Sequence, residues 1–204
     1  MKLYFSPGSC SMASHIVLEE GGTPYSTERV NLQDKTTETG ADYTRINPKG
    51  YVPAVVLDDG QMIGENSALL AYLGEMGTKL KLMPAAGTLD NFRVREWLGF
   101  ISSELHKNCS PLYRPNTPEA TIQFQRELLA KRFAYVNAEL RGRSFLTGER
   151  FTSADAYLFV VLNWMGQLKI DLAPYPNLSA FHARVMARSA VQKVMRDEGL
   201  IKAA

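Results

Sequence analysis

Cysteine is scarce in this chain of 204 residues, which has only Cys10 and Cys109. The sequence pattern places them in different domains, so we expect no disulfide framework and a reducing, cytoplasmic setting. No run approaches the roughly 18 consecutive apolar residues of a membrane helix. The first residues lack the basic stretch and apolar core of a signal peptide. Histidine is rare too. His15, His106 and His182 form no cluster with cysteine or carboxylates, so we expect no metal site.

Neither sign of charge dominates, since the formal net charge is +2. Residues 1–80 hold 6 Lys+Arg against 10 Asp+Glu, whereas residues 81–204 hold 17 against 11. The basic residues of the second part are scattered among carboxylates and do not gather on one face. A nucleic-acid partner is therefore not expected. Hydrophobic residues make up 45% of the chain, which is typical of a soluble globular protein with a substantial core.

The first part of the chain, residues 1–77, alternates strand and helix signals. Apolar strands are predicted at 2–5, 26–30, 54–57 and 61–63, and helices at 12–20 and 66–76. A polar loop is expected up to residue 40, and a turn at 58–60 closes a hairpin. This order predicts a small α/β sandwich with a mixed sheet. Residues 77–87 carry Lys, Gly and Pro without periodicity, which indicates a linker between domains.

From residue 89 to 204 the strand signals disappear and helical periodicity takes over. A first amphipathic helix is marked by apolar residues spaced three and four apart, namely Val94, Trp97, Leu98, Ile101 and Leu105. Prolines at 111–118 end it, and a second long helix is predicted at 118–140. Residues 154–165 are apolar nearly all round, as in a helix buried within a bundle. Shorter helices at 177–188 and 190–198 complete an all-α domain.

Cys10 is the first candidate for chemistry, because it stands between the strand at 2–5 and the start of a helix near Ser11. A thiol at the first turn of a helix faces unpaired backbone N–H groups and the positive end of the helix dipole, which favour the thiolate. The alternative is a free cysteine that merely packs. Pro7 and Ala13 stand three positions away on either side, so a thioredoxin-type dithiol cycle is excluded and redox chemistry would need an external thiol.

Two further segments point to peptide binding. Proline often has a cis bond where it enters a strand after a turn, and Val52-Pro53 is such a place. That geometry would leave the N–H and C=O of Val52 available to an extended peptide; the alternative is an ordinary loop with two prolines. At 64–68, Glu65 and Asn66 open a helix whose N-terminus suits a carboxylate, with Glu65 suited to an ammonium group. Ordinary helix capping is again the alternative.

In combination these segments resemble the glutathione S-transferases, most closely the bacterial beta class, over the whole chain. The matching residues are 4–11, 47–54, 65–69, Gly148 and 152–155. The resemblance implies a thioredoxin-like glutathione-binding domain at 1–77 and an all-α, helical-bundle domain at 89–204 that completes the electrophile site. It also implies a homodimer that conjugates the glutathione thiol to small hydrophobic electrophiles, with glutathione as co-substrate and no cofactor. Thiol–disulfide exchange or reductive dehalogenation through Cys10, and non-catalytic ligand binding, stay open.

The resemblance also implies roles for individual residues. The backbone of Val52 would pair with the cysteinyl part of glutathione, and Glu65 with Asn66 would hold the γ-glutamyl end. Lys35 would meet the glycine carboxylate. Cys10 would lie beside the glutathione sulfur. The implied catalytic residues are Cys10, Ser11 and His106; the further implied glutathione contacts are Tyr51, Pro53, Gly99, Ser103, Glu104 and Leu105; and the candidates for the electrophile pocket are Phe5, Ser9, His106, Tyr113 and Trp164.

The first long helix carries the part of this site that the resemblance assigns partly to a neighbouring subunit. Gly99, Ser103 and His106 are spaced by four and three, which predicts one stripe beside the apolar one. His106 would lie at the mouth of the electrophile site; the alternative is a histidine on the helix surface. Thr152 and Asp155 form a capping box, which we assign to structure and not to catalysis.

Overall fold

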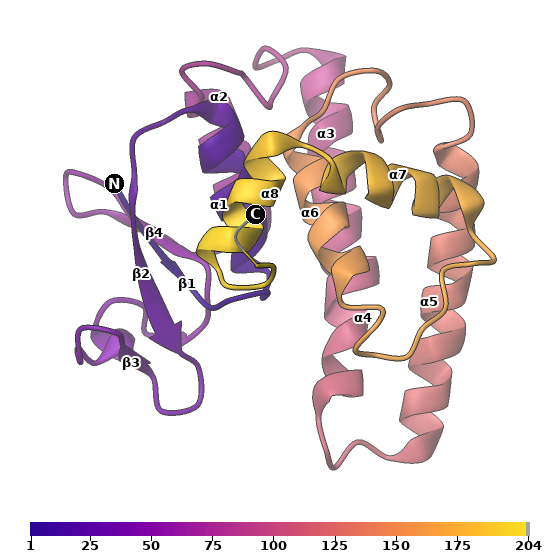
Figure 1. Cartoon of the computed structure of the whole chain (residues 1–204), viewed down its shortest axis with the longest axis horizontal. Helices are drawn as coiled ribbons and strands as arrows, with labels where there is room; N and C mark the ends of the chain where they lie inside the picture. The colour runs from indigo at the N-terminus through magenta and orange to yellow at the C-terminus, as the bar shows by residue number, and fades with distance from the viewer. Residues whose placement is uncertain (203–204) are drawn as a thin grey trace.

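The computed structural model describes residues 1–202 and divides into two lobes that pack side by side (Figure 1). The first lobe holds a sheet and two main helices. Its elements are β1 (Lys2–Phe5), α1 (Ser11–Gly21), β2 (Ser26–Asn31), β3 (Thr36–Thr37), η1 (Tyr43–Arg45), β4 (Ala54–Val56), β5 (Met62–Ile63) and α2 (Asn66–Met76). The thioredoxin-like α/β fold predicted for this part is confirmed.

The sheet is mixed, with strand order β3-β2-β1-β4-β5. β1 runs parallel to β2 and antiparallel to β4, and β5 and β3 lie antiparallel at the two edges. β3 falls within the stretch that we predicted to be a polar loop, so that prediction was wrong there. A strand of two threonines is too short to show alternation, and it forms because Val30 and Asn31 offer it an edge.

The second lobe has only helices among the elements named in its described part, residues 89–202, as predicted. Its elements are α3 (Leu89–Phe100), the π-helix η2 (Ile101–His106), α4 (Lys107–Cys109), η3 (Ser110–Tyr113), α5 (Glu119–Glu139), α6 (Ser153–Asn163), α7 (Pro176–Met186) and α8 (Ser189–Asp197). The last two residues of the predicted domain, 203 and 204, lie outside the described residues. None of the helices in residues 1–202 combines the length and apolar character needed to cross a membrane.

α6 lies at the centre of the second lobe, where residues 153–162 are all buried. Its start has the predicted capping box between Thr152 and Asp155. The Asp155 carboxylate accepts hydrogen bonds from the Thr152 N–H at 2.8 Å and from the Leu146 N–H at 2.8 Å. The box therefore fixes both the first turn of α6 and the loop in front of it.

The segment between the lobes, residues 77–87, has no regular structure, yet it packs closely. Leu82 and Met83 are buried in the core that both lobes share. The Leu82 N–H donates to Gly74 O at 2.9 Å, and the Ser153 N–H donates to Leu82 O at 3.0 Å. A Cβ on Gly74 would lie 2.3 Å from Ser153 Oγ, so only glycine lets α2 approach α6 this closely. The two lobes are joined by a packed seam.

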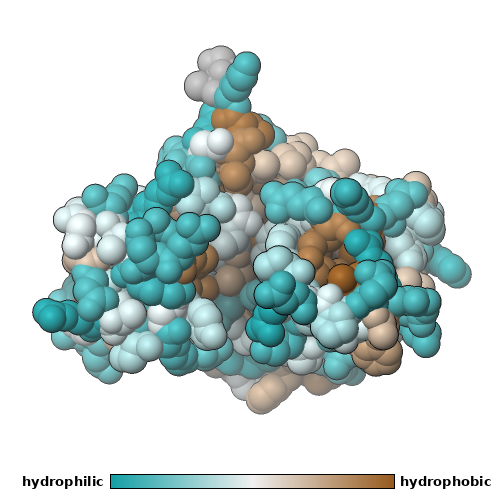
Figure 2. Space-filling view, turned by 90° about the horizontal axis from the view of Figure 1, so that it is seen from below, coloured by the Kyte–Doolittle hydropathy of each residue, from teal (hydrophilic) through white to brown (hydrophobic). Residues whose placement is uncertain are grey.

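The chain ends by returning to the first lobe, where α8 lies against α1 (Figure 1). Glu198, which follows α8, is buried and bonds to His15 of α1 at 2.9 Å. A space-filling view from below shows a hollow between the two lobes (Figure 2). The turn that carries Cys10 belongs to the first lobe, and the C-terminal segment holds this turn in place.

Candidate active site

The turn between β1 and α1 is held from the second lobe at a single glycine. Gly8 has φ +69°, in the left-handed region that favours glycine. Its N–H donates to Glu198 Oε2 at 2.8 Å, and its carbonyl accepts from Trp164 Nε1 at 2.9 Å. Both partners are more than 150 residues away in the sequence. The position of the following residues, including Cys10, therefore depends on the helical lobe.

Cys10 is the N-cap residue of α1, and its thiol points toward the loop before β4. Sγ donates to Val52 O at 3.1 Å. Burial raises the pKa of the Cys10 thiol to about 12, although the backbone N–H groups of Cys10 and Ser11 lower it. The sequence analysis predicted that the helix N-terminus would favour the Cys10 thiolate. That prediction is wrong, because the effect of burial on the pKa is larger than the opposing effect of the helix N-terminus.

Ser11 is turned into the protein and holds the turn together. Its side chain is fully buried. The hydroxyl donates to Ser6 O at 3.2 Å, accepts from the Ser6 N–H at 3.1 Å and lies 2.8 Å from Ser9 Oγ. These bonds occupy the hydroxyl, so its geometry supports a structural role in shaping the turn.

The loop before β4 brings several predicted site residues together. The Val52–Pro53 bond is cis, as predicted. Pro53 is buried and Tyr51 is 67% exposed. The Val52 N–H has no hydrogen-bond partner within residues 1–202, whereas its carbonyl accepts from Cys10. Lys35 reaches this loop, because its Nζ donates to Gly50 O at 3.1 Å.

Two buried side chains under this loop fix its course, and sequence reasoning did not find either role. Tyr43, which is fully buried, donates from its hydroxyl to Tyr51 O at 2.8 Å. Asn47 Nδ2 donates to the same oxygen at 2.7 Å. The carbonyl before Val52 is thus satisfied from inside the protein, whereas the Val52 N–H has no hydrogen-bond partner within residues 1–202.

The N-terminus of α2 lies beside Cys10. Asn66 is buried; its Nδ2 donates to Cys10 O at 3.2 Å, and its Oδ1 accepts from Ser14 Oγ at 3.2 Å. The Asn66 side chain therefore ties α2 to α1. Glu65 caps α2 without a side-chain hydrogen bond to the helix, is largely exposed, and pairs with Lys49. Because these contacts converge, Cys10, Val52 and Glu65 lie along one margin of the lobe.

His106 is the contribution of the second lobe. Its Nδ1 lies 2.6 Å from the hydroxyl of Tyr157 on α6, and its ring centroid lies 4.9 Å from that of Trp164. Burial, with a smaller effect of Lys107, lowers the pKa of His106 to about 4. The imidazole is therefore neutral near pH 7. Through Trp164 it is adjacent to the Gly8 turn.

The other residues of this helix that were predicted to contact glutathione are Gly99, Ser103, Glu104 and Leu105, and they do not lie together on one stripe with His106. Residues 101–106 form a π-helix, so the predicted stripe of Gly99, Ser103 and His106 is wrong, because its spacing assumed an α-helix. Gly99 and Ser103 are exposed, with Ser103 Oγ donating to Gly99 O at 3.1 Å. Glu104 pairs with Arg132 of α5 at 2.6 Å. Leu105 is fully buried in the core, which leaves its side chain no surface for glutathione.

Comparison with known proteins identifies the family. The model of the glutathione S-transferase N-terminal domain matches residues 8–76, and that of the C-terminal domain matches residues 100–189. The chain belongs to the glutathione S-transferase family. Glutathione S-transferase GstA of Escherichia coli O157:H7 is 42% identical to it over 200 residues, which cover 98% of this chain and 100% of GstA.

Solved transferases share the same structure. A sphingomonad glutathione S-transferase complexed with glutathione is 39% identical, with a TM-score of 0.94, and the match covers 98% of this chain and 100% of that one. A bacterial beta class glutathione S-transferase from Sphingomonas chungbukensis is 37% identical, with the same TM-score and the same coverage. The resemblance to beta class transferases that the sequence indicated is confirmed.

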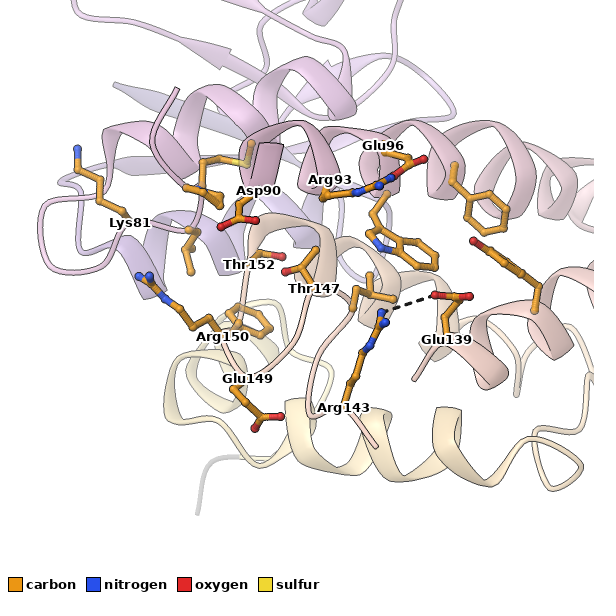
Figure 3. Close-up of a pocket in the computed structure, with 18 residues that line it drawn as sticks. Lys81, Asp90, Arg93, Glu96, Glu139, Arg143, Thr147, Glu149, Arg150 and Thr152 are labelled. Carbon is orange, nitrogen blue, oxygen red and sulfur yellow. Dashed lines mark hydrogen bonds and ion pairs between the residues drawn. The ribbon is translucent and has the colours of Figure 1, made fainter. Parts of the chain in front are cut away.

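One cavity of this transferase lies apart from Cys10. It has a volume of about 920 Å³ and lies between α3, α5 and the loop at 146–152 (Figure 3). Trp97, Phe100 and Tyr135 form an aromatic cluster in its wall. Arg93 pairs with Glu96, and Arg143 with Glu139. The cavity contains none of the predicted site residues. Within residues 1–202 no group of three or more His, Cys, Asp or Glu side chains is arranged to hold a metal.

Tyr157 is a further residue near the site that sequence reasoning missed. It lies in the run at 154–165 that was assigned to the core, and it is indeed buried. A signal was present, because a hydroxyl in an otherwise apolar buried helix must find a hydrogen-bond partner. The sequence does not say which partner, since His106 lies 51 residues away and approaches only through the packing of η2 on α6.

Proposed function

We propose that this transferase conjugates the thiol of glutathione to small hydrophobic electrophiles. The observation that carries the proposal is the margin formed by Val52, Cys10 and Glu65. It offers the backbone N–H and C=O of Val52, the Cys10 thiol at the start of α1 and the Glu65 carboxylate at the start of α2. In glutathione, the cysteinyl peptide groups would face Val52, the thiol would face Cys10 and the γ-glutamyl ammonium would face Glu65.

The tripeptide would bind by strand addition at Val52. Its cysteinyl carbonyl accepts from the Val52 N–H, and its cysteinyl N–H donates to Val52 O. The Glu65 carboxylate receives the γ-glutamyl ammonium, which takes the place of Lys49. The ammonium of Lys35, already at the Gly50 carbonyl, meets the glycine carboxylate as a point charge.

Binding in this mode changes the hydrogen bond made by Cys10. The cysteinyl N–H of glutathione competes for Val52 O, to which the Cys10 thiol donates in the unliganded protein. The Cys10 S–H is then free to donate to the glutathione sulfur. This donor and the N–H groups at the start of α1 favour the glutathione thiolate, and Cys10 itself stays protonated.

The chemical step is an attack by the glutathione sulfur on carbon. The glutathione thiol loses its proton to solvent, and the thiolate attacks an electrophilic carbon. A carbon–sulfur bond forms and, with an aromatic halide, the halide leaves with its bonding electrons. Trp164 and Tyr113, in edge contact at a centroid distance of 6.4 Å, supply an aromatic wall for the electrophile beside His106.

The proposal is tested with glutathione and chlorodinitrobenzene. We expect calorimetry to show glutathione binding and absorbance to show formation of the thioether. Glu65→Gln should raise the KM for glutathione by about 10-fold or more, because it removes the charged partner of the ammonium. Glu127→Gln on the surface of α5 is the matched control and should leave KM unchanged. If glutathione neither binds nor reacts, the proposal is wrong.

Thiol–disulfide exchange through Cys10 is the second candidate. The raised pKa and the bond to Val52 O disfavour it, because exchange requires a thiolate. Intact mass after incubation with oxidised glutathione distinguishes the two. A Cys10 adduct that forms within seconds, together with loss of reductase activity in Cys10→Ala, would establish exchange as the main activity.

We also infer a cytoplasmic homodimer. The cytoplasmic setting is supported by the two unpaired cysteines. A subunit interface is supported by large apolar side chains exposed on α3, Leu89 at 68% and Phe92 at 59%. Gly99 and Ser103 are exposed on the same helical segment and form no hydrogen bond with the Cys10 margin within residues 1–202. The resemblance to the family assigns their contact with glutathione partly to the partner subunit. Sedimentation analysis tests the homodimer by measuring the mass of the protein in solution.

A further inference from the structure

Tyr157 joins the centre of the helical lobe to the candidate active site. Its ring is fully buried on α6, and its hydroxyl lies 2.6 Å from His106 Nδ1, with the two rings nearly perpendicular. This is a short contact for an oxygen and a nitrogen. A hydroxyl buried this deeply must be bonded, so the pairing with His106 is a fixed part of the structure.

The surroundings of the Tyr157 oxygen decide which atom donates. A hydroxyl has one proton to give and two lone pairs to accept with. Burial raises the pKa of Tyr157, so the hydroxyl keeps its proton near pH 7. Within residues 1–202 the only hydrogen-bond partner of this hydroxyl is His106 Nδ1. If Nδ1 donated, the buried O–H would have no acceptor, so the hydroxyl gives its proton to Nδ1.

A proton donated to Nδ1 fixes the tautomer of the imidazole. The ring is neutral near pH 7, so it carries one proton, and an Nδ1 that accepts places this proton on Nε2. Nε2 has no hydrogen-bond partner among residues 1–202. The ring is only partly buried and packs on Trp164, whose indole holds the Gly8 turn in front of Cys10. His106 therefore offers a free N–H next to the turn where the sulfur would lie.

We propose that Tyr157 is a positioning residue that donates to His106 Nδ1 and so makes His106 Nε2–H a hydrogen-bond donor to the glutathione thiolate. In this arrangement His106 stabilises negative charge on sulfur and does not act as the base that removes the thiol proton. The proposal rests on the proposed function for its catalytic meaning. The tautomer itself is a property of the unliganded protein.

The tautomer is tested without any activity measurement. In a nitrogen-15 NMR experiment on the unliganded wild-type protein at neutral pH, we expect His106 to show a protonated Nε2 and an unprotonated Nδ1. Tyr157→Phe should shift the His106 resonances toward a mixture of tautomers, since the hydroxyl that selects one of them is gone. A wild-type His106 with its proton on Nδ1 would overturn the proposal, even if the protein conjugates glutathione.

Kinetics test the consequence for the reaction. Tyr157→Phe should lower kcat/KM for chlorodinitrobenzene by about 5- to 10-fold. The apparent pKa of bound glutathione in the pH–rate profile should rise by roughly half a unit to one unit. The KM for glutathione should stay within about 3-fold, since Tyr157 contacts none of the groups proposed to bind the peptide.

A matched control separates this effect from the general loss of a phenolic hydroxyl. Tyr25 donates its phenolic proton to Glu19 at 2.9 Å and forms no hydrogen bond with His106 or Tyr157 within residues 1–202. Tyr25→Phe should therefore leave the pH–rate profile and the His106 resonances unchanged. A Tyr157→Phe profile identical to that of wild type would contradict the proposed role in catalysis. If neither protein turns over glutathione, the proposed function fails and the NMR result still decides the tautomer.

Discussion

Trp164 Nε1 donates to the carbonyl oxygen of Gly8 across 2.9 Å, which joins the end of α6 to the turn that precedes Cys10. The Gly8 N–H is bonded in turn by Glu198, so both polar backbone groups of one glycine are held by the helical lobe. The helical lobe therefore sets the position of the Cys10 turn in addition to supplying a wall for the electrophile.

Replacing Trp164 by Phe should loosen this turn. We expect a loss of about 0.5–1.5 kcal/mol in the free energy of unfolding from the missing hydrogen bond, with further loss from the smaller ring. Amide exchange at Ser9 and Cys10 should accelerate in the same variant. Trp97→Phe is the control, because Trp97 is also buried, with 8% of its surface exposed, and lines the separate cavity. Equal acceleration in both variants would show that the Gly8 contact does not fix the turn.

The stability of the protein should depend on the protonation of His106. The folded protein lowers the pKa of His106 from 6.5 to about 4, so the unfolded chain takes up this proton first as the pH falls. The stabilising contribution is present above pH 6.5 and is lost progressively down to about pH 4, by about 3 kcal/mol in total.

The contribution is isolated by comparison with His106→Asn. Carboxylates also titrate in this range, but they do so in both proteins, so their effect cancels in the difference between the two unfolding free energies. We expect that difference to shrink as the pH falls from 6.5 toward 4. A difference independent of pH would mean that His106 titrates normally in the folded protein.

Cys10 should react slowly with alkylating reagents in the unliganded protein. Its pKa of about 12 leaves almost no thiolate at neutral pH, and its proton is engaged with Val52 O. We expect iodoacetamide to modify it at least about 10-fold more slowly than a free small-molecule thiol under the same conditions. Because Cys109 is a second free cysteine, the mass of the modified peptide must show that Cys10 is the residue alkylated. Rapid alkylation at Cys10 would show that the thiol is ionised near neutral pH, as the sequence analysis predicted.

Much of this fold follows from sequence periodicity, and the part that does not follow is instructive. The strand at 2–5, the helix at 66–76 and the capping box at Thr152 were predicted because each has a strong local signal. The π-turn at 101–106 was not, since one extra residue per turn leaves no trace in the apolar pattern. It is this turn that separates His106 from the stripe of Ser103.

In the candidate site, too, the features set by local sequence could be predicted and those set by tertiary packing could not. The Val52–Pro53 loop and Glu65 could be found because each stands at a recognisable turn. The pKa of Cys10 could not be predicted, because the helix dipole is visible in the sequence whereas the burial of the thiol in the folded protein is not. The contact between Tyr157 and His106 likewise depends on how two helices pack.

Lys49 should compete with glutathione for Glu65. Its ammonium pairs with the carboxylate that is proposed to bind the ammonium of glutathione. Both side chains are well exposed, so the pair is worth only about 0.2–1 kcal/mol. Lys49→Gln should therefore lower the dissociation constant for glutathione by at most about 2- to 5-fold, and the gain should fade at high ionic strength. Lys2→Gln, which removes a lysine paired with Glu28 instead, is the control and should leave binding unchanged. If Lys49→Gln weakens binding instead, Lys49 is a ligand of the γ-glutamyl carboxylate, and the Lys49–Glu65 pair then receives both charges of the γ-glutamyl end together.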